Sequence, residues 1–190
     1  MPRRGLDRAQ VVEAAAALAD EEGLEAVTLA RVAAGLGVRP PSLYVHVAGG
    51  LDALRREVAL LGLRELAAGM RDAAVGRARG DALAAVARAY RAYALAHPGR
   101  YAATVRAPDA ADTELAAAAG EAVEVLAAVL RGWGHKGTDG IHAVRGIRAA
   151  LHGFVAVERA GGFALATSVD ESFERLVATL AAGLDQRPSA

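Results

Sequence analysis

One stretch of the sequence decides the fold of its N-terminal part, Thr28-Leu-Ala-Arg-Val-Ala-Ala-Gly-Leu-Gly-Val-Arg-Pro-Pro-Ser-Leu-Tyr-Val-His-Val47. Thr28 can cap a helix. The apolar residues that follow it recur at helical spacing, at Leu29, Val32, Ala33 and Leu36. Gly37 ends this helix, and the two prolines suit the first turn of another, where a missing backbone N–H costs nothing. We expect the second helix to continue through Leu43 to Val47 and to end at a pair of glycines.

The turn between these helices, Gly35-Leu-Gly-Val38, indicates what they can do. A short helix, a glycine-containing turn and a second short helix form a helix-turn-helix. The small Ala33 lets the helices cross closely, and Val38 and Leu43 would fill the angle between them. In such a unit the second helix presents its N-terminal residues to a DNA major groove, which is wide enough for one helix. The spacing therefore predicts a DNA-binding segment.

Helical signals continue on both sides of this stretch. Asp7 and Gln10 have the spacing of a capping box, and Gly23 ends the helix that they begin. Beyond residue 50, caps, glycines and prolines divide the chain into further helices, and no strand pattern or internal repeat occurs. We predict an all-α fold of about nine helices. A three-helix helix-turn-helix domain would span residues 1–50, and an antiparallel helical bundle would span residues 51–190.

The composition excludes several other classes of protein. The 190 residues include 49 alanines and are 54% hydrophobic, which is too apolar for a disordered chain. The absence of cysteine excludes a disulfide scaffold, a thiol nucleophile and a cysteine-ligated metal site. No stretch reaches the ~18 apolar residues of a membrane span, and the N-terminus lacks the apolar segment of a signal peptide. We therefore expect a cytoplasmic protein without a metal, a cofactor or a membrane partner.

The charge balance limits how the chain could bind DNA. The formal net charge is zero, and residues 1–50 contain five arginines and six acidic residues. A nonspecific nucleic-acid coat would need a strong basic excess. Any DNA surface must therefore come from the arrangement of a few charges.

The quoted stretch resembles the DNA-binding region of the TetR family of repressors. The resemblance rests on residues 28–38 and on Pro41-Ser-Leu-Tyr-Val-His-Val47, and by motif it covers residues 7 to about 60. Two later stretches, His97-Pro-Gly-Arg-Tyr-Ala-Ala-Thr104 and Leu151-His-Gly-Phe154, resemble a TetR subfamily with a Trp-His-Gly signature, whose tryptophan is replaced here by Leu151. The resemblance implies a ligand-responsive regulator, and we favour a repressor. It would bind a pseudo-palindromic double-stranded DNA operator as a homodimer and be released by a small-molecule effector.

The resemblance also implies roles for single residues. Thr28 would cap its helix and donate to a DNA phosphate, and Tyr44 and His46 would contact the DNA backbone. The residues expected to face base edges are Arg39, Pro40, Ser42 and Val45. Arg39 is the strongest candidate for guanine, because a guanidinium can bond O6 and N7 together. Taken singly, Tyr44 could instead be a half-buried core residue and His46 an ordinary surface residue.

Two positions depart from the family pattern. Val47 stands where a bulky aromatic residue is usual, and Gly50 stands where lysine is usual, which removes one phosphate contact. Backbone N–H groups at the start of the next helix could replace that contact. Arg3, Arg4 and Arg8 could also compensate as an N-terminal arm.

The remaining 140 residues must regulate or dimerise. In the resembled family the last two helices pair with their copies in a four-helix bundle, and the last two helices expected here carry apolar stripes. The residues that we assign to this contact are Val144, Leu151, Val155, Phe173, Leu176, Val177 and Leu180. The alternative is that these stripes only fill the core of one chain.

The effector site is predicted from scarce aromatic and polar-tipped residues in the middle of the chain. A pocket in a helical bundle needs an apolar lining with few polar groups. The residues that would fit are Tyr93, Tyr101, Trp133 and His152, and the effector would be small and largely apolar. Ordinary core positions are the alternative for each of them.

Two other kinds of protein remain possible. A helical enzyme would use the same central pocket, but we predict no enzyme because no acid–base pair or nucleophile motif stands out. A helical binding protein with lost or weak DNA binding is suggested by Gly50 and by the acidic balance of residues 1–50.

Overall fold

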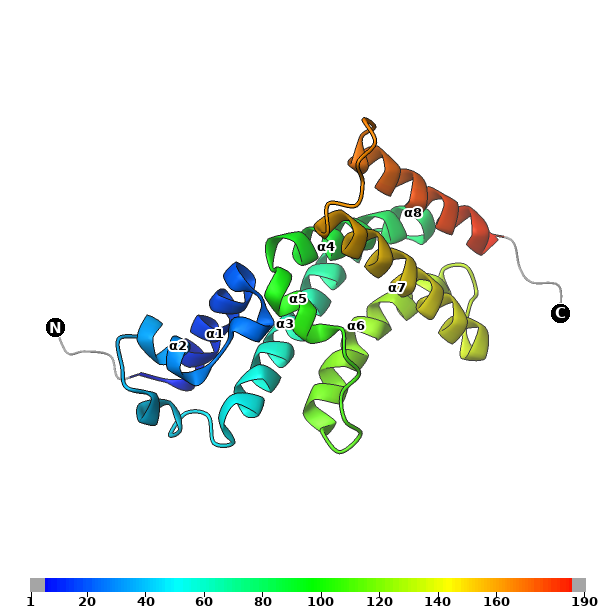
Figure 1. The fold of residues 1–190 in the computed structure, drawn as a ribbon. Helices are drawn as coiled ribbons and strands as arrows, with labels where there is room; N and C mark the ends of the chain where they lie inside the picture. The colour runs from blue at the N-terminus through cyan, green and yellow to red at the C-terminus, as the bar shows by residue number, and fades with distance from the viewer. Residues whose placement is uncertain (1–5, 186–190) are drawn as a thin grey trace. The chain divides into compact units, whose positions relative to one another are not determined.

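The structure is a computed structural model that describes residues 6–185, and within that range it contains eight α-helices, two 3₁₀ helices and no strand (Figure 1). The all-α prediction is confirmed, and the number of helices is close to the number expected. Among the described residues, no helix is long and apolar enough to cross a membrane.

The helices form two compact units. The first comprises residues up to Glu65 together with Ala96–Ala119, and the second comprises Leu66–Leu95 together with the residues from Gly120 onwards. The first unit holds α1 (Arg8–Glu22), η1 (Leu24–Ala26), α2 (Leu29–Gly35), η2 (Pro40–Leu43), the first part of α3 (Gly50–Ala74), α5 (Pro98–Thr104) and the start of α6 (Thr113–Arg131). The second holds the end of α3, most of α4 (Arg79–Ala96), the rest of α6, α7 (Gly137–Arg159) and α8 (Val169–Asp185). This division differs from the boundary expected at residue 50, because α3 begins at that residue and runs without interruption through both units.

Local signals in the sequence explain where the first helices begin. Asp7 accepts a hydrogen bond from the Gln10 N–H and the Gln10 side chain accepts one from the Asp7 N–H, so the expected capping box is formed. Gly23 ends α1 with a φ of 91°, a backbone conformation that favours glycine. Thr28 caps α2 by accepting a hydrogen bond from the Arg31 N–H.

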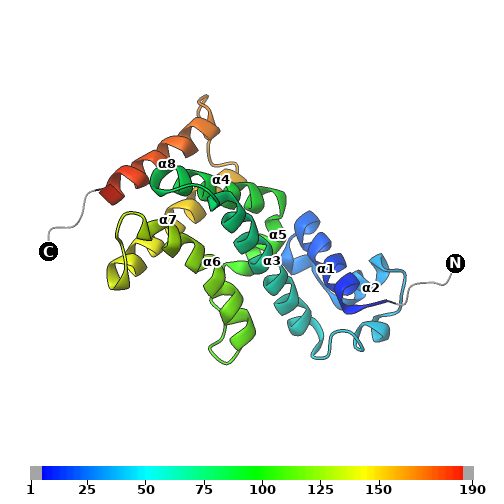
Figure 2. The same ribbon diagram turned by 180° about the vertical axis from the view of Figure 1, so that it is seen from behind.

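The core of the first unit joins the helix-turn-helix to its supports. Its buried side chains come from α1, α2, η2, the start of α3 and the bend before α3, and include Val11, Ala15, Val32, Ala33, Leu43, Val47, Leu54 and Val58. In both views α1 lies between α2 on one side and α5 on the other (Figures 1 and 2). Helix α1 is therefore the central element that connects the α2–η2 segment to α5.

Two glycines allow α5 to pack closely within this unit. A Cβ atom at Gly99 would lie 2.1 Å from the carbonyl carbon and oxygen of Ala19 on α1. A Cβ atom at Gly62 on α3 would lie 2.9 Å from the carbonyl oxygen of Arg100. These contacts leave no room for a side chain at either glycine.

The core of the second unit corrects our assignment of the dimer contact. Val144, Leu151 and Val155 on α7 are at most 6% exposed in a single chain, and Phe173 and Val177 on α8 are at most 3% exposed. Side chains already buried by their own chain have no surface left for a partner, so these five residues belong to the chain's own core. Leu176 and Leu180 are half-buried and keep part of their surface in water.

Candidate DNA-binding site

The reversal between α2 and η2 has the geometry of a helix-turn-helix. The N–H of Leu36 still donates to the carbonyl of Val32, and the N–H of Val38 then turns back to the carbonyl of Ala33 at 3.0 Å. Gly37 makes this possible with a φ of 67°, in the left-handed region where a Cβ atom is disfavoured. The turn is therefore closed by its own backbone hydrogen bonds.

The second helix of the motif is shorter and tighter than expected. It is a 3₁₀ helix at Pro40–Leu43, followed by turns rather than by an α-helix that reaches Val47. Adjacent prolines supply no N–H, so the first available donor, on Ser42, bonds back three residues to the carbonyl of Arg39 at 2.9 Å. Gly49 and Gly50, with φ of 108° and 73°, then lead into α3.

Burial divides this segment into anchors and exposed residues. Leu43 and Val47 are 0% and 3% exposed and hold the segment on the core. Val47 thus occupies a core position where the family pattern has a larger residue. Between and before these anchors, His46 is half-buried and the exposed side chains are Arg39, Pro40, Pro41, Ser42, Tyr44 and Val45. Tyr44 is 54% exposed and Val45 is 84% exposed, which excludes a core position for either.

The arginines of this region differ in whether a carboxylate offsets their charge. Arg8 pairs with Glu57 on α3 at 2.6 Å, and Arg31 pairs with Glu22 on α1. Arg39 forms no ion pair with any residue that the structure describes. Arg3 and Arg4, which we considered as an arm, lie outside the described residues. Within residues 6–50, Arg39 is therefore the arginine most available to an external anion.

A carboxylate on α1 holds the start of α5 in place. Asp20 accepts hydrogen bonds from the backbone N–H groups of Gly99 and Arg100, each at 2.9 Å, and its other oxygen lies 3.2 Å from Nδ1 of His97. The Arg100 guanidinium in turn contacts Glu65 on α3 at 2.9 Å. The stretch that begins at His97 carries a recognisable motif, whereas Asp20 has no local signal because it lies 77 residues away along the chain.

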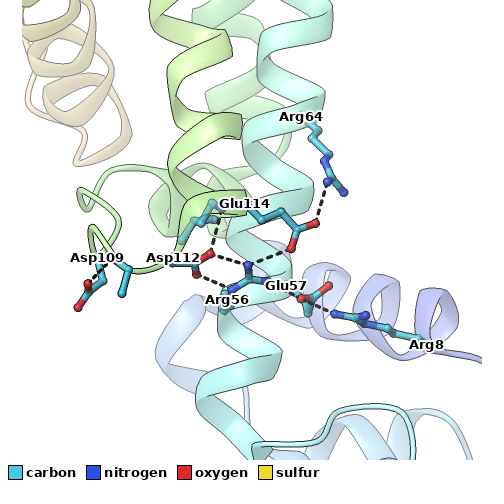
Figure 3. Close-up of polar contacts among 9 residues, drawn as sticks. Arg8, Arg56, Glu57, Arg64, Asp109, Asp112 and Glu114 are labelled. Carbon is cyan, nitrogen blue, oxygen red and sulfur yellow. Dashed lines mark hydrogen bonds and ion pairs between the residues drawn. The ribbon is translucent and has the colours of Figure 1, made fainter.

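An ion-pair cluster joins α3 to the start of α6 in the same unit (Figure 3). The Arg56 guanidinium contacts Asp112 at 2.6 Å and Glu114 at 3.0 Å, and Arg64 contacts the other oxygen of Glu114 at 3.0 Å. The Arg56 hydrogen bond, together with one from the Leu115 N–H, lowers the pKa of Asp112. Arg56 and Arg64 lower the pKa of Glu114 in the same way. The cluster therefore connects the first part of α3 to the start of α6.

The predicted effector residues do not all lie in one unit. Tyr101 is 2% exposed in α5 of the first unit, whereas Tyr93, Trp133 and His152 belong to the second. The indole N–H of Trp133 donates to Asp185 at 2.9 Å. That these four side chains share one ligand stays a prediction. Among the described residues, no group of three or more His, Asp or Glu side chains is placed to hold a metal ion.

Comparison with protein families gives two matches along the chain. The family described as "Bacterial regulatory proteins, tetR family" matches residues 11–46, which contain α1, α2 and η2. The family described as "Tetracyclin repressor-like, C-terminal domain" matches residues 83–180. The Trp-His-Gly subfamily stays a prediction.

Similar proteins extend over nearly the whole chain. An uncharacterised HTH-type transcriptional regulator from Mycobacterium tuberculosis is 38% identical over 96% of this chain and 83% of its own length. Another from Bacillus subtilis is 35% identical over 96% of this chain and 95% of its own length. A solved structure from Rhodococcus sp. RHA1, of unknown function, has a TM-score of 0.82 at 22% identity and covers 98% of this chain and 100% of its own. A TetR variant from Acinetobacter baumannii AYE in complex with minocycline has a TM-score of 0.71 at 22% identity, covering 95% of this chain and 97% of its own. At such identities the two structures show a shared fold.

Proposed function

Because this chain belongs to the TetR family of transcriptional regulators, we propose that it is a repressor that binds a pseudo-palindromic operator as a homodimer and leaves it when a small molecule binds. The observation that carries the proposal is the division of the turn segment into two buried anchors and a set of exposed residues. Arg39 is exposed and has no carboxylate partner in the described chain, so its charge is available to DNA. A protein that binds the chromosome acts in the cytoplasm, which is the location that we propose.

The exposed residues suit two kinds of DNA contact. We assign Arg39 to guanine, Val45 to a thymine methyl group, and Pro40 and Ser42 to neighbouring base edges. We assign Thr28, Tyr44 and His46 to phosphates, which fix the position of the protein on the duplex. The hydroxyl oxygen of Thr28 already accepts a hydrogen bond from the Arg31 N–H, so its own O–H is left to donate outward.

The dimer contact that we now propose uses the outward faces of α7 and α8. Small exposed residues recur along α7 at helical spacing, namely Gly146, Ala149, Gly153 and Ala156. Ile141 and Val157 on the same helix are 53% and 43% exposed, and Leu176 and Leu180 add half-buried apolar surface on α8. Small residues let two helices approach closely, and a two-fold axis would place two recognition segments about 34 Å apart, one turn of DNA.

Effector release follows from linkage between the two binding events. A small molecule lowers operator affinity only by the difference in its own affinity for the DNA-bound and DNA-free arrangements. We propose a small effector with a largely apolar body. Tyr93, Tyr101, Trp133 and His152 remain proposed contacts, for which half-burial of Tyr93 and His152 is the support.

The decisive experiment is selection of bound duplexes from a random DNA pool. The affinity for the most enriched duplex is then measured as a function of salt concentration. A pseudo-palindrome with a steep negative salt slope is the expected result, and the slope gives the number of phosphates contacted. Failure to enrich any sequence with a folded, effector-free dimer would reject the proposal. It would instead favour the helical binding protein, in which Gly50 has removed a phosphate contact.

A further inference from the structure

A cleft in the second unit has the size of a ligand site. It has a volume of about 460 Å³ and lies between the end of α3, the start of α4 and the second half of α6. Small-molecule sites in proteins span roughly 300–1,000 Å³. None of the four residues that we predicted for the effector lines this cleft.

The cleft has an apolar floor and a charged rim. Ala82, Val125 and Val129 contribute apolar surface and are at most 8% exposed in the chain as a whole. Four arginines also line the cleft, against two carboxylates, Glu121 and Glu124. The arginines are Arg71, Arg77, Arg79 and Arg131. A molecule that fits both parts must combine an apolar body with negative charge.

The pairing of these arginines leaves positive charge at the rim. Arg71 pairs with Glu121 at 3.1 Å, and Arg131 pairs with Glu124 at 2.7 Å. The Arg77 guanidinium donates to the carbonyl oxygens of Ala73 at 2.8 Å and Val75 at 3.4 Å, and it forms no ion pair within residues 6–185. Arg77 therefore carries the charge that a bound anion would neutralise first.

Arg79 is held at the rim in an unusual backbone conformation. Its φ of 48° is the one positive φ of a non-glycine residue in the described chain. Its guanidinium pairs with Asp185 at 2.9 Å and lies 5.7 Å from the ring centroid of Trp133, which donates to the same carboxylate oxygen. Such backbone conformations persist where the surrounding structure enforces them, and they cluster at ligand sites.

We infer that this cleft binds a small amphipathic anion, with its apolar body on the Ala82, Val125 and Val129 floor and its carboxylate or phosphate group at the arginine rim. A guanidinium offers two parallel N–H donors to either group, which gives strong and oriented hydrogen bonds. The inference rests on the proposed function, because it names the chemical class of the effector. It adds the cleft as a contact surface for the effector and leaves the four aromatic and histidine contacts as proposed, with Trp133 beside the rim at Arg79.

The single tryptophan of the chain provides the measurement. The fluorescence of Trp133 is titrated with decanoate, decyl phosphate and decan-1-ol below their aggregation limits, and calorimetry supplies an independent affinity. Decanoate or decyl phosphate is expected to bind about tenfold more tightly than the neutral alcohol, as charge-assisted hydrogen bonds require. Comparison of the two anions distinguishes a carboxylate site from a phosphate site.

Variants test whether the arginines at the rim are responsible for anion binding. Arg77→Ala and Arg131→Ala are each expected to weaken anion binding about fivefold or more and to leave binding of the alcohol unchanged. Arg88→Ala is the control, because Arg88 is 59% exposed and paired with Glu174 in the same unit but does not line the cleft. Circular dichroism confirms that each variant is folded.

Equal affinity for both anions and the alcohol, or unchanged anion binding in both rim variants, would overturn the inference. Operator binding, measured on the same preparations, separates it from the proposed function. If the protein binds its operator but binds neither anion, only the inference about the cleft is rejected. If the protein binds an anion but selects no DNA sequence, the proposed repressor function is rejected and the ligand site is supported.

Discussion

Arg39 is the residue on which sequence-specific binding is expected to depend most. It precedes the two prolines, is exposed, and has no carboxylate to compete with DNA among the described residues. Arg39→Ala is expected to cost about 1–3 kcal/mol of discrimination per subunit at one base pair. Electrophoretic mobility shifts with the selected operator and its single-base variants measure this. Arg106→Ala, an exposed arginine in the same unit, is the control, and equal losses in both variants would contradict base reading.

Substitution of Tyr44 tests the proposed contacts with DNA phosphates. Tyr44 is 54% exposed, so its hydroxyl is accessible to a phosphate. Tyr44→Phe is expected to weaken binding by about 1 kcal/mol on every sequence alike, because one hydrogen bond is lost and no base contact changes. The measurement is affinity for the operator and for scrambled duplexes. A changed order of preference among sequences would count against the phosphate role.

The backbone conformation of Arg79 predicts a difference in stability between two variants that lack the same side chain. Both Arg79→Ala and Arg79→Gly abolish the ion pair with Asp185, but glycine accepts a φ of 48° without a steric cost. The glycine variant is therefore expected to be more stable than the alanine variant by about 1–2 kcal/mol. Urea unfolding of both variants checks this, and identical midpoints would mean that the backbone at this residue relaxes freely.

The packing of the helices in the first unit depends on how closely α5 approaches α1. Gly99→Ala places a Cβ atom 2.1 Å from backbone atoms of Ala19, which cannot rotate away, so α5 must move. A loss of about 1–3 kcal/mol in the free energy of unfolding is expected, as for other overpacked sites.

Gly69→Ala is the matched control on α3, because nothing lies within 4 Å of the Cβ atom that it adds. There the better helix former should stabilise the chain by about 0.5–1 kcal/mol. Thermal or urea unfolding of the two variants should shift in opposite directions. Equal shifts would show that the contact between α5 and Ala19 is not limiting.

The elements also show what could be predicted from the sequence. Caps and glycines placed α1 and α2 correctly, because those signals act through neighbouring residues, as with Asp7 and Gln10. The shape of η2 was missed because the loss of two N–H donors at Pro40 and Pro41 outweighed helical periodicity. The stripes on α7 and α8 were assigned to a partner chain because periodicity identifies a buried face without saying what buries it. The cleft arginines form no local motif, so only the fold brings Arg71 and Arg131 to one rim.

Ion pairs in both units make the free energy of unfolding depend on pH. The pKa values of Glu22, Asp112, Glu114 and Glu174 are lowered by arginine partners. The unfolded chain therefore binds protons at higher pH than the folded chain, and folding stability falls as the pH drops below about 4.5. Unfolding midpoints in urea between pH 7 and pH 3 should follow this sign.

Arg56 allows a specific check of that dependence. Arg56→Ala removes the partner of Asp112 and Glu114, so the difference in unfolding midpoint between this variant and the parent should narrow as the pH falls. For Arg106→Ala the difference should stay constant with pH. A constant difference for Arg56→Ala would mean that this ion-pair cluster contributes nothing to stability.

The membership of Ala96–Ala119 in the first unit has a consequence for recombining regulators. A chimaera joined at residue 50 would graft the DNA reader onto a foreign sensor without Gly99 and Arg100, whose backbone N–H groups donate to Asp20 on α1 from a distance in sequence. A transplant that carries Ala96–Ala119 as well keeps those contacts. For this chain we therefore expect a short recognition segment to be exchanged with less loss of stability than a whole N-terminal fragment.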